Sequence, residues 1–193
     1  MLLYQMVPLR RAAVSLAVDL SPIIGKIASR GTKRQIDTMF HRFCHEADYY
    51  PTLSRLPLHV RMKLDLIGVK ISLKDWLSIS FAERTVLCHL PCASDEEKAV
   101  FTAYLDFLSQ KYRGVPVQMT EIMDSALWEQ SLVPEPVRKK SAESGVVTTN
   151  EWLGWQSHQR YALYKTAISK SQPEAFADVL DELRQKRKLA TGT

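Results

Sequence analysis

The chain of 193 residues is 46% hydrophobic and contains only 7 glycines, which supports a folded core and excludes an intrinsically disordered protein. It has no uninterrupted apolar run of the roughly 18–20 residues that a membrane-spanning helix requires. The net charge is +5, but residues 1–38 and 184–193 each contribute +4 and the middle carries about −3, which argues against nucleic acid as a partner because such binders usually carry positive charge on the folded domain.

Residues 1–38 have the composition of an extension. They contain six Lys or Arg residues against two Asp residues and are rich in Ala, Ser and Leu. This composition is typical of an organelle presequence or of an amphipathic surface segment; alternatively, Met39 is the biological start. We therefore expect a flexible basic extension over 1–38, a folded domain over 39–183 and a basic tail over 184–193. The expected location is the cytoplasm, or an organelle if residues 1–38 are a presequence.

Helix start signals recur through the folded domain. A hydroxyl residue stands three positions before a carboxylate in four capping boxes, which begin at Ser72, Ser80, Ser94 and Thr148. Apolar residues then fall at helical spacing, as in the helix predicted over 95–112 and ended by Gly114. A second apolar stripe predicts a helix after Pro173: Phe176, Val179, Leu180 and Leu183. No convincing alternation of period two is present, so the predicted fold class is all-α.

The chain also resembles itself. At a shift of 77 residues, Pro57, Val60, Arg61, Lys63, Gly68 and Val69 match Pro134, Val137, Arg138, Lys140, Gly145 and Val146. At a shift of 76 residues, Ser72, Asp75, Trp76, Leu77, Glu83, Arg84 and Leu87 match Thr148, Glu151, Trp152, Leu153, Gln159, Arg160 and Leu163. We therefore predict a helical bundle built from an internally duplicated three-helix module, with repeat 1 over about 57–91 and repeat 2 over about 134–168. Both repeats are expected to share one core, with Trp76 and Trp152 buried at equivalent positions.

The basic residues of the repeats have two interpretations. The guanidinium groups of Arg61, Arg84, Arg138 and Arg160 either pair with carboxylates and helix ends or form a surface for an anion or a partner. Their presence in both repeats favours the structural role. As an interaction surface, the candidate residues are Arg61, Lys63, Arg84, Arg160 and Cys92.

Two clusters contain the side chains that bind soft metals: His41-Arg-Phe-Cys44-His45 and Cys88-His89-Leu-Pro-Cys92. Their spacing fits no standard zinc pattern, so no metal is expected, and Cys92, His89, Cys88 and Cys44 are only weak candidates. Three cysteines at irregular spacing form no disulfide framework and suit a reducing compartment. Cys92 lies just before the helix that begins at Ser94, whose dipole would lower the pKa of the thiol; alternatively, Cys92 is a packed small residue in a turn.

The sequence contains no Gly-rich phosphate loop, no Gly-x-Ser-x-Gly elbow and no His-Glu-x-x-His motif. We therefore expect no enzyme activity, no catalytic residues and no cofactor.

An ordered set of residues resembles the nitrate reductase associated protein family. In the first half these are Leu56-Pro-Leu-His-Val-Arg-Met-Lys-Leu-Asp-Leu-Ile-Gly-Val-Lys70, Trp76, Ser80, Glu83-Arg84, Leu87 and Leu90-Pro-Cys92. In the second half they are Val133-Pro134, Gly145, Trp152 and Gln159-Arg-Tyr-Ala-Leu163. With the opening aromatic and acidic segment from Phe40 to Tyr49, the resemblance covers roughly residues 39–183.

The resemblance implies a small cytoplasmic protein that helps to produce active nitrate reductase, an enzyme that requires a molybdopterin cofactor and an iron–sulfur cluster. The expected partner is nitrate reductase or its molybdenum-cofactor delivery machinery. The expected function is that of a non-catalytic accessory or maturation factor that acts by protein–protein interaction. The alternatives are a metal- or sulfur-carrying protein that uses Cys92, and a helical regulatory or nucleic-acid-binding module that uses the basic ends.

Overall fold

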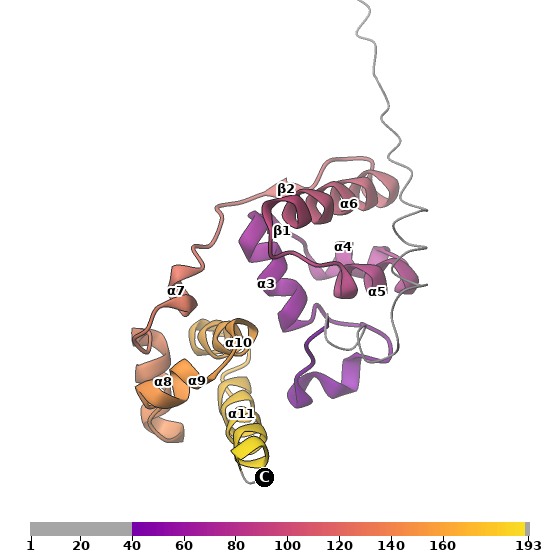
Figure 1. The fold of residues 1–193 in the computed structure, drawn as a ribbon. Coiled ribbons are helices and arrows are strands. Elements are labelled where there is room, and N and C mark those ends of the chain that lie inside the picture. The colour runs from indigo at the N-terminus through magenta and orange to yellow at the C-terminus, as the bar shows by residue number, and fades with distance from the viewer. Residues whose placement is uncertain (1–39, 192–193) are drawn as a thin grey trace, which may run out of the picture.

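The computed structural model describes residues 40–191, so the predicted extension over 1–38 lies outside the described residues. Helices dominate the fold, and the predicted all-α class is confirmed (Figure 1). A 3-10 helix, η1 (Cys44–Tyr49), comes first. It is followed by α3 (Leu58–Ile67), α4 (Leu73–Ser78), α5 (Phe81–His89), α6 (Asp95–Arg113), α7 (Ala126–Glu129), α8 (Glu135–Ser144), α9 (Thr149–Gly154), α10 (Ser157–Ile168) and α11 (Ala175–Thr191).

The structure also contains one small antiparallel sheet that the sequence analysis did not predict. It joins β1 (Val69–Lys70) to β2 (Gln118–Met119), with Val69 opposite Met119. Strands of two residues are too short to produce a recognisable alternation. Before β1, Gly68 has φ 63°, and a Cβ atom there would lie only 2.7 Å from the carbonyl oxygen of Thr120. Glycine is therefore required where the second strand approaches the end of α3.

All four predicted helix caps are present. The side chains of Ser72, Ser80, Ser94 and Thr148 each accept a hydrogen bond from the backbone N–H three residues later. The predicted stop of α6 is also present, since Gly114 has φ 71° at the end of that helix. These elements are encoded locally, because each depends only on residues within one turn of the helix end.

Each half of the molecule has its own hydrophobic cluster. The N-terminal half, from α3 to α6, buries Trp76, and the C-terminal half, from α7 to α11, buries Trp152 in a separate cluster. Both indole rings are 0% exposed, as predicted. The prediction of one common core is wrong, however, because the buried apolar residues form two separate clusters. Figure 1 shows the two groups of helices joined by the long connection that contains β2 and α7.

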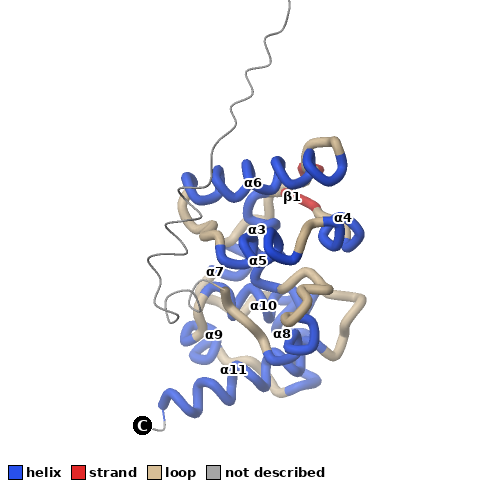
Figure 2. Tube along the Cα trace, turned by 90° about the vertical axis from the view of Figure 1, so that its right-hand side faces the viewer, coloured by secondary structure: helices blue, strands red, loops and turns tan. Residues whose placement is uncertain are grey.

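The two halves meet where α3 lies next to α10, near the centre of the molecule (Figure 2). The hydroxyl of Tyr161 on α10 donates to Asp65 on α3, at 2.6 Å. η1 contacts α11, and the backbone N–H of Cys44 donates to Oε2 of Glu182 at 2.6 Å. Among residues 40–191, no helix has the length and apolar character to cross a membrane.

The segment from Arg184, predicted as a basic tail, instead continues α11 to Thr191. Arg184 Nε forms an ion pair with Glu151 Oε1 at 2.8 Å, and its Nη2 donates to the carbonyl oxygen of Val146 at 3.1 Å. Arg187 Nη1 donates to the carbonyl oxygen of Asn150 at 3.2 Å. Positive charges at this end of the chain thus hold α11 against the start of α9.

Candidate functional site

Trp76 and Trp152, which the internal sequence match pairs, occupy closely similar surroundings. Nε1 of Trp76 donates to the carbonyl oxygen of Leu53 at 2.8 Å. Nε1 of Trp152 donates to the carbonyl oxygen of Gln130 at 2.9 Å. Leu53 and Gln130 are themselves 77 residues apart, which is the first of the two offsets found in the sequence. In both halves, therefore, a buried indole fixes the short capped helix to the segment that precedes the first helix of the module.

Arg84 and Arg160, two of the interaction candidates, also have parallel contacts. Arg84 Nη1 donates to the carbonyl oxygen of Leu53 at 2.8 Å, and Arg160 Nη1 donates to that of Glu129 at 3.2 Å. Each guanidinium carbon lies 5.9 Å from the ring centroid of the tryptophan in its own half. Main-chain and aromatic contacts therefore hold these half-buried groups within the scaffold, in agreement with the structural interpretation.

Lys63 is only 3% exposed and stabilises the end of α5. Its Nζ donates to the carbonyl oxygens of Leu87, Cys88 and Leu90 at 3.3, 2.9 and 2.6 Å. These carbonyls belong to the last turn and C-cap of the helix, where intrahelical donors are missing. Burial lowers the pKa of Lys63 to about 8. Lys63, which the sequence analysis had suggested as an interaction candidate, is therefore not available to bind a partner, because its ammonium group is enclosed by the protein.

Cys92 does not have the surroundings of a reactive thiolate. It is 7% exposed, and its Sγ lies 3.9 Å from the carbonyl oxygen of Lys63. Burial raises the pKa of Cys92 to about 11, so the predicted lowering by the helix that follows is wrong. Desolvation of the charged thiolate outweighs the helix dipole here. The side chain behaves as a packed small residue in the turn between α5 and α6.

The other weak metal candidates, Cys88, Cys44 and His89, lie in different surroundings. Cys88 is buried, and burial raises its pKa to about 12, whereas Cys44 is exposed on η1. His89 Nδ1 lies 2.8 Å from the carbonyl oxygen of Thr85 within α5. In the part of the chain that the structure describes, no three His, Cys, Asp or Glu side chains form a group with the geometry of a metal site.

Histidines instead gather where the two halves meet. The rings of His41 and His158 stack with centroids 3.5 Å apart and planes 2° from parallel. The backbone N–H of His41 donates to Nδ1 of His59 at 3.2 Å. Burial is the largest cause that lowers the pKa of His59 to about 2, that of His158 to about 3 and that of His41 below its usual value. The three rings are therefore neutral at pH 7.

A polar cavity of about 260 Å³ lies beside this junction, between η1, α3, α10 and the start of α11. Its polar lining includes His45, Glu46, Tyr49, Arg61, Lys165 and Gln172. The sequence analysis singled out Arg61 and the His45 cluster, but it missed Lys165 and Gln172. These residues are far apart in the sequence, and the contacts of α3 with α10 and of η1 with α11 bring them together.

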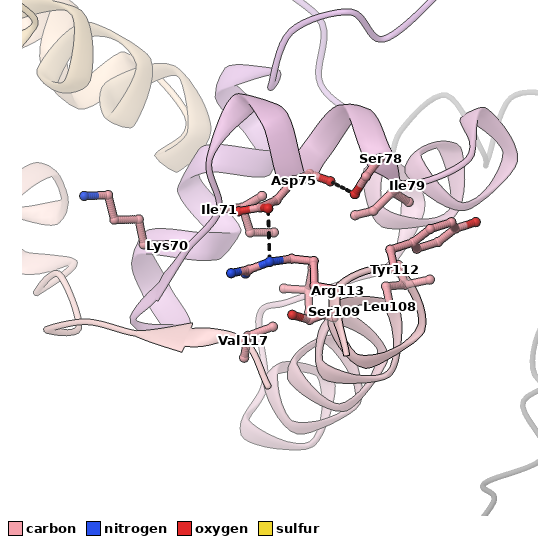
Figure 3. Close-up of a pocket in the computed structure, with 11 residues that line it drawn as sticks. Lys70, Ile71, Asp75, Ser78, Ile79, Leu108, Ser109, Tyr112, Arg113 and Val117 are labelled. Carbon is pink, nitrogen blue, oxygen red and sulfur yellow. Dashed lines mark hydrogen bonds and ion pairs between the residues drawn. The ribbon is translucent and has the colours of Figure 1, made fainter. Parts of the chain in front are cut away.

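A second depression is much smaller and lies between α4 and α6 (Figure 3). Its volume is about 20 Å³, which leaves room for little more than one water molecule. Arg113 Nε on α6 lies 3.1 Å from Asp75 Oδ1 on α4, across the mouth of the depression. This pair holds the two helices together, and the space between them is a packing feature.

The outer surface of α4 and the start of α5 is apolar. Leu73, Leu77 and Phe81 are 53%, 47% and 50% exposed, and we call them the α4–α5 patch. The residues at the matching positions of the C-terminal half are Thr149, Leu153 and Ser157. Lys70 and Lys74, which are also exposed, lie close to Leu73 in the sequence. The two halves thus share the hydrogen bonds of their buried tryptophans but differ at two of these three exposed positions.

A family model described as conserved nitrate reductase-associated protein matches residues 42–183. The match runs from just before η1 into α11 and therefore includes both halves and their junction. The chain has no match among the curated proteins and none among the solved structures.

Proposed function

Because the chain belongs to the conserved nitrate reductase-associated protein family, we propose that it is a non-catalytic accessory or maturation factor for assimilatory nitrate reductase. The observation that carries this proposal is the family match over residues 42–183. The protein acts in the cytoplasm by binding another protein, which is nitrate reductase itself or the machinery that delivers its molybdenum cofactor. The candidate residues for chemistry are consistent with this role, since Cys88, Cys92 and Lys63 are packed inside the fold.

The scaffold for this binding consists of two copies of one three-helix module. The matching hydrogen bonds of Trp76 and Trp152, and the matching positions of Arg84 and Arg160, support a duplication. Duplicated modules keep the residues that hold the fold and diverge where one copy has taken on a separate task. Surface residues that differ between the halves are therefore the best guide to the partner-binding face.

The α4–α5 patch is the surface that we assign to the partner. Leu73 and Leu77 lie one helical turn apart on α4, and Phe81 is the first residue of α5. An apolar surface with a polar rim is typical of a protein–protein contact. Because exposed Lys70 and Lys74 are sequence neighbours of Leu73, we expect the complementary surface on nitrate reductase or its delivery machinery to be apolar with acidic residues at its edge.

Deletion of the gene tests the proposed role. The deletion strain should fail to grow with nitrate as the nitrogen source and should grow normally on ammonium, and the wild-type gene should restore growth on nitrate. Equal growth of the deletion strain on both nitrogen sources would refute the accessory role.

A double variant tests the assigned surface. Leu73→Asp and Phe81→Asp each change the first residue of a helix, where a carboxylate is favourable, so the fold should be retained. In the deletion strain this variant should restore little or no growth on nitrate, although its thermal unfolding should match that of the wild type. The control, Thr149→Asp with Leu153→Asp, places two carboxylates at exposed positions of α9 that match Leu73 and Leu77, and it should restore growth fully. Full growth with the Leu73→Asp, Phe81→Asp variant would exclude the α4–α5 patch while leaving the accessory role intact.

A further inference from the structure

The cavity at the junction of the halves has a lining with unequal charges. Arg61 and Lys165 supply two cations, and Glu46 supplies one carboxylate. Lys165 Nζ lies 2.6 Å from Asp65 Oδ2, so its charge is already compensated. Arg61 Nε donates to the carbonyl oxygen of Leu56 at 3.0 Å, and within the described range no carboxylate forms an ion pair with its guanidinium group. The exposed side chain of Arg61 thus brings to the cavity a positive charge that is not held in an ion pair.

Glu46 lines the same cavity but forms no ion pair with Arg61 among the described residues. It is only 1% exposed, and its oxygens accept hydrogen bonds from the backbone N–H of Leu58 at 2.8 Å and from the hydroxyl of Tyr50 at 2.5 Å. The hydroxyl of Tyr49 also donates to Glu46. The carboxylate therefore serves as an internal acceptor that joins η1 to the start of α3.

Another polar group of the lining lacks a partner. Nδ1 of His45 is buried from solvent and makes no hydrogen bond among the described residues. Buried polar nitrogen atoms are normally satisfied by protein, water or a ligand. Gln172, which precedes α11, adds an amide group on the opposite side of the same cavity. The lining thus offers a fork of guanidinium donors, an imidazole nitrogen and an amide around one cavity.

From this arrangement we infer that the junction cavity is a binding site for a small molecule with a planar oxyanion group, a carboxylate or nitrate. The guanidinium fork of Arg61 matches the two oxygens of such a group with paired hydrogen bonds. A volume of about 260 Å³ admits a small metabolite. Since η1 and α3 form one wall and α10 and the start of α11 form the other, the bound molecule would contact both halves. This site is independent of the α4–α5 patch.

A titration of the ¹⁵N-labelled full chain followed by NMR tests the site. The probes are sodium succinate and sodium nitrate, with sodium chloride at matched ionic strength as the control for screening. We expect saturable shifts of the amides around Arg61, Lys165 and Gln172 with at least one of the two oxyanions and none with chloride. The probe that saturates identifies the source of the oxyanion. Absence of saturable shifts with both probes would overturn the proposal.

Substitutions of Arg61 test how the oxyanion is recognised. Arg61→Gln should weaken binding of the saturating probe by about tenfold or more, and Arg61→Lys should also weaken it because a lysine keeps the charge but loses the fork. Arg138→Gln changes the matching exposed arginine on α8, away from the cavity, and should bind like the wild type. Wild-type affinity in Arg61→Gln or in Arg61→Lys would contradict the assigned recognition.

Discussion

The hydroxyl of Tyr161 and the ammonium group of Lys165 each lie 2.6 Å from the same oxygen of Asp65. Tyr161 and Lys165 are one turn apart on α10, and Asp65 lies on α3, so a single carboxylate joins the two halves. Burial raises the pKa of Tyr161 well above its usual value, and the hydroxyl therefore remains a donor at neutral pH.

Asp65→Asn should destabilise the protein by about 1–3 kcal/mol, because it leaves the half-buried ammonium group of Lys165 without its counter-charge. Urea unfolding at pH 7 measures this change. Asp95→Asn is the control, since its ion pair with Lys98 is on the surface and the Asp95 side chain is 96% exposed. The control should change stability by less than about 0.5 kcal/mol. Equal effects of the two variants would show that the ion pair of Asp65 with Lys165 stabilises the protein no more than a surface ion pair does.

Arg84→Leu and Arg160→Leu should each destabilise the protein by about 1–3 kcal/mol, because each removes a donor to a main-chain carbonyl and a cation from the face of a buried indole. Arg138→Leu, at an exposed position, should be nearly neutral. Thermal unfolding distinguishes the three. If Arg84→Leu and Arg160→Leu kept wild-type stability and yet abolished growth on nitrate, these arginines would be partner-binding residues.

Thiol labelling should divide the three cysteines into two classes. An aromatic disulfide reagent at pH 8 should modify exposed Cys44 quickly in the native protein. Cys88 and Cys92 should react only after unfolding, because burial shields them and raises the pKa of their thiols to about 12 and about 11. The native Cys44→Ser variant should therefore show almost no fast reaction. Rapid labelling of Cys92 in that variant would revive the carrier hypothesis.

The histidines at the junction should make the protein less stable in acid. In the folded chain the pKa of His59 is about 2, whereas an unfolded histidine has a pKa of about 6.5, so the unfolded state takes up the proton first. The contribution of His59 is complete above about pH 6.5 and is lost as the pH falls, by up to about 2 kcal/mol at pH 5. Burial lowers the pKa of His158 as well and adds to the loss in the same direction.

Urea unfolding between pH 7.5 and pH 5 measures this loss. His59→Gln keeps an acceptor for the backbone N–H of His41 but removes the titrating ring, so its stability should depend less on pH than that of the wild type. An unchanged pH dependence in His59→Gln would contradict the assignment.

The sequence was sufficient for features that depend on neighbouring residues. The caps at Ser72 and Thr148 and the stop at Gly114 were predicted because each is decided within one helical turn. Burial of Trp76 and Trp152 followed from the repeated pattern. Of the two interpretations of Cys92, the packed small residue is confirmed and the lowered pKa is wrong, because the helix dipole is visible in the sequence whereas the burial that raises the pKa is not.

Features that depend on distant residues were not accessible from the sequence. Lys63 lies in a repeated motif, but its role at the end of α5 depends on how α3 and α5 pack. Its counterpart, Lys140, is less buried and lies 3.7 Å from Glu143, which shows that the same motif position serves different purposes in the two halves. The junction cavity needs α3 beside α10, and no local pattern contains that contact.

Phe43 lies just before η1, and Leu58 is the first residue of α3. Their side chains are nevertheless buried in the hydrophobic cluster of the C-terminal half. The C-terminal half therefore does not enclose its interior with its own residues alone, because side chains of the N-terminal half complete its cluster. A protease that cuts the exposed connection at Thr120–Ile122 would break the covalent chain, but the two fragments should remain associated. The side chains of Phe43 and Leu58 and the carboxylate of Asp65 would still hold them together. Expression of either fragment by itself would expose apolar surface that the other normally covers, and aggregation would follow.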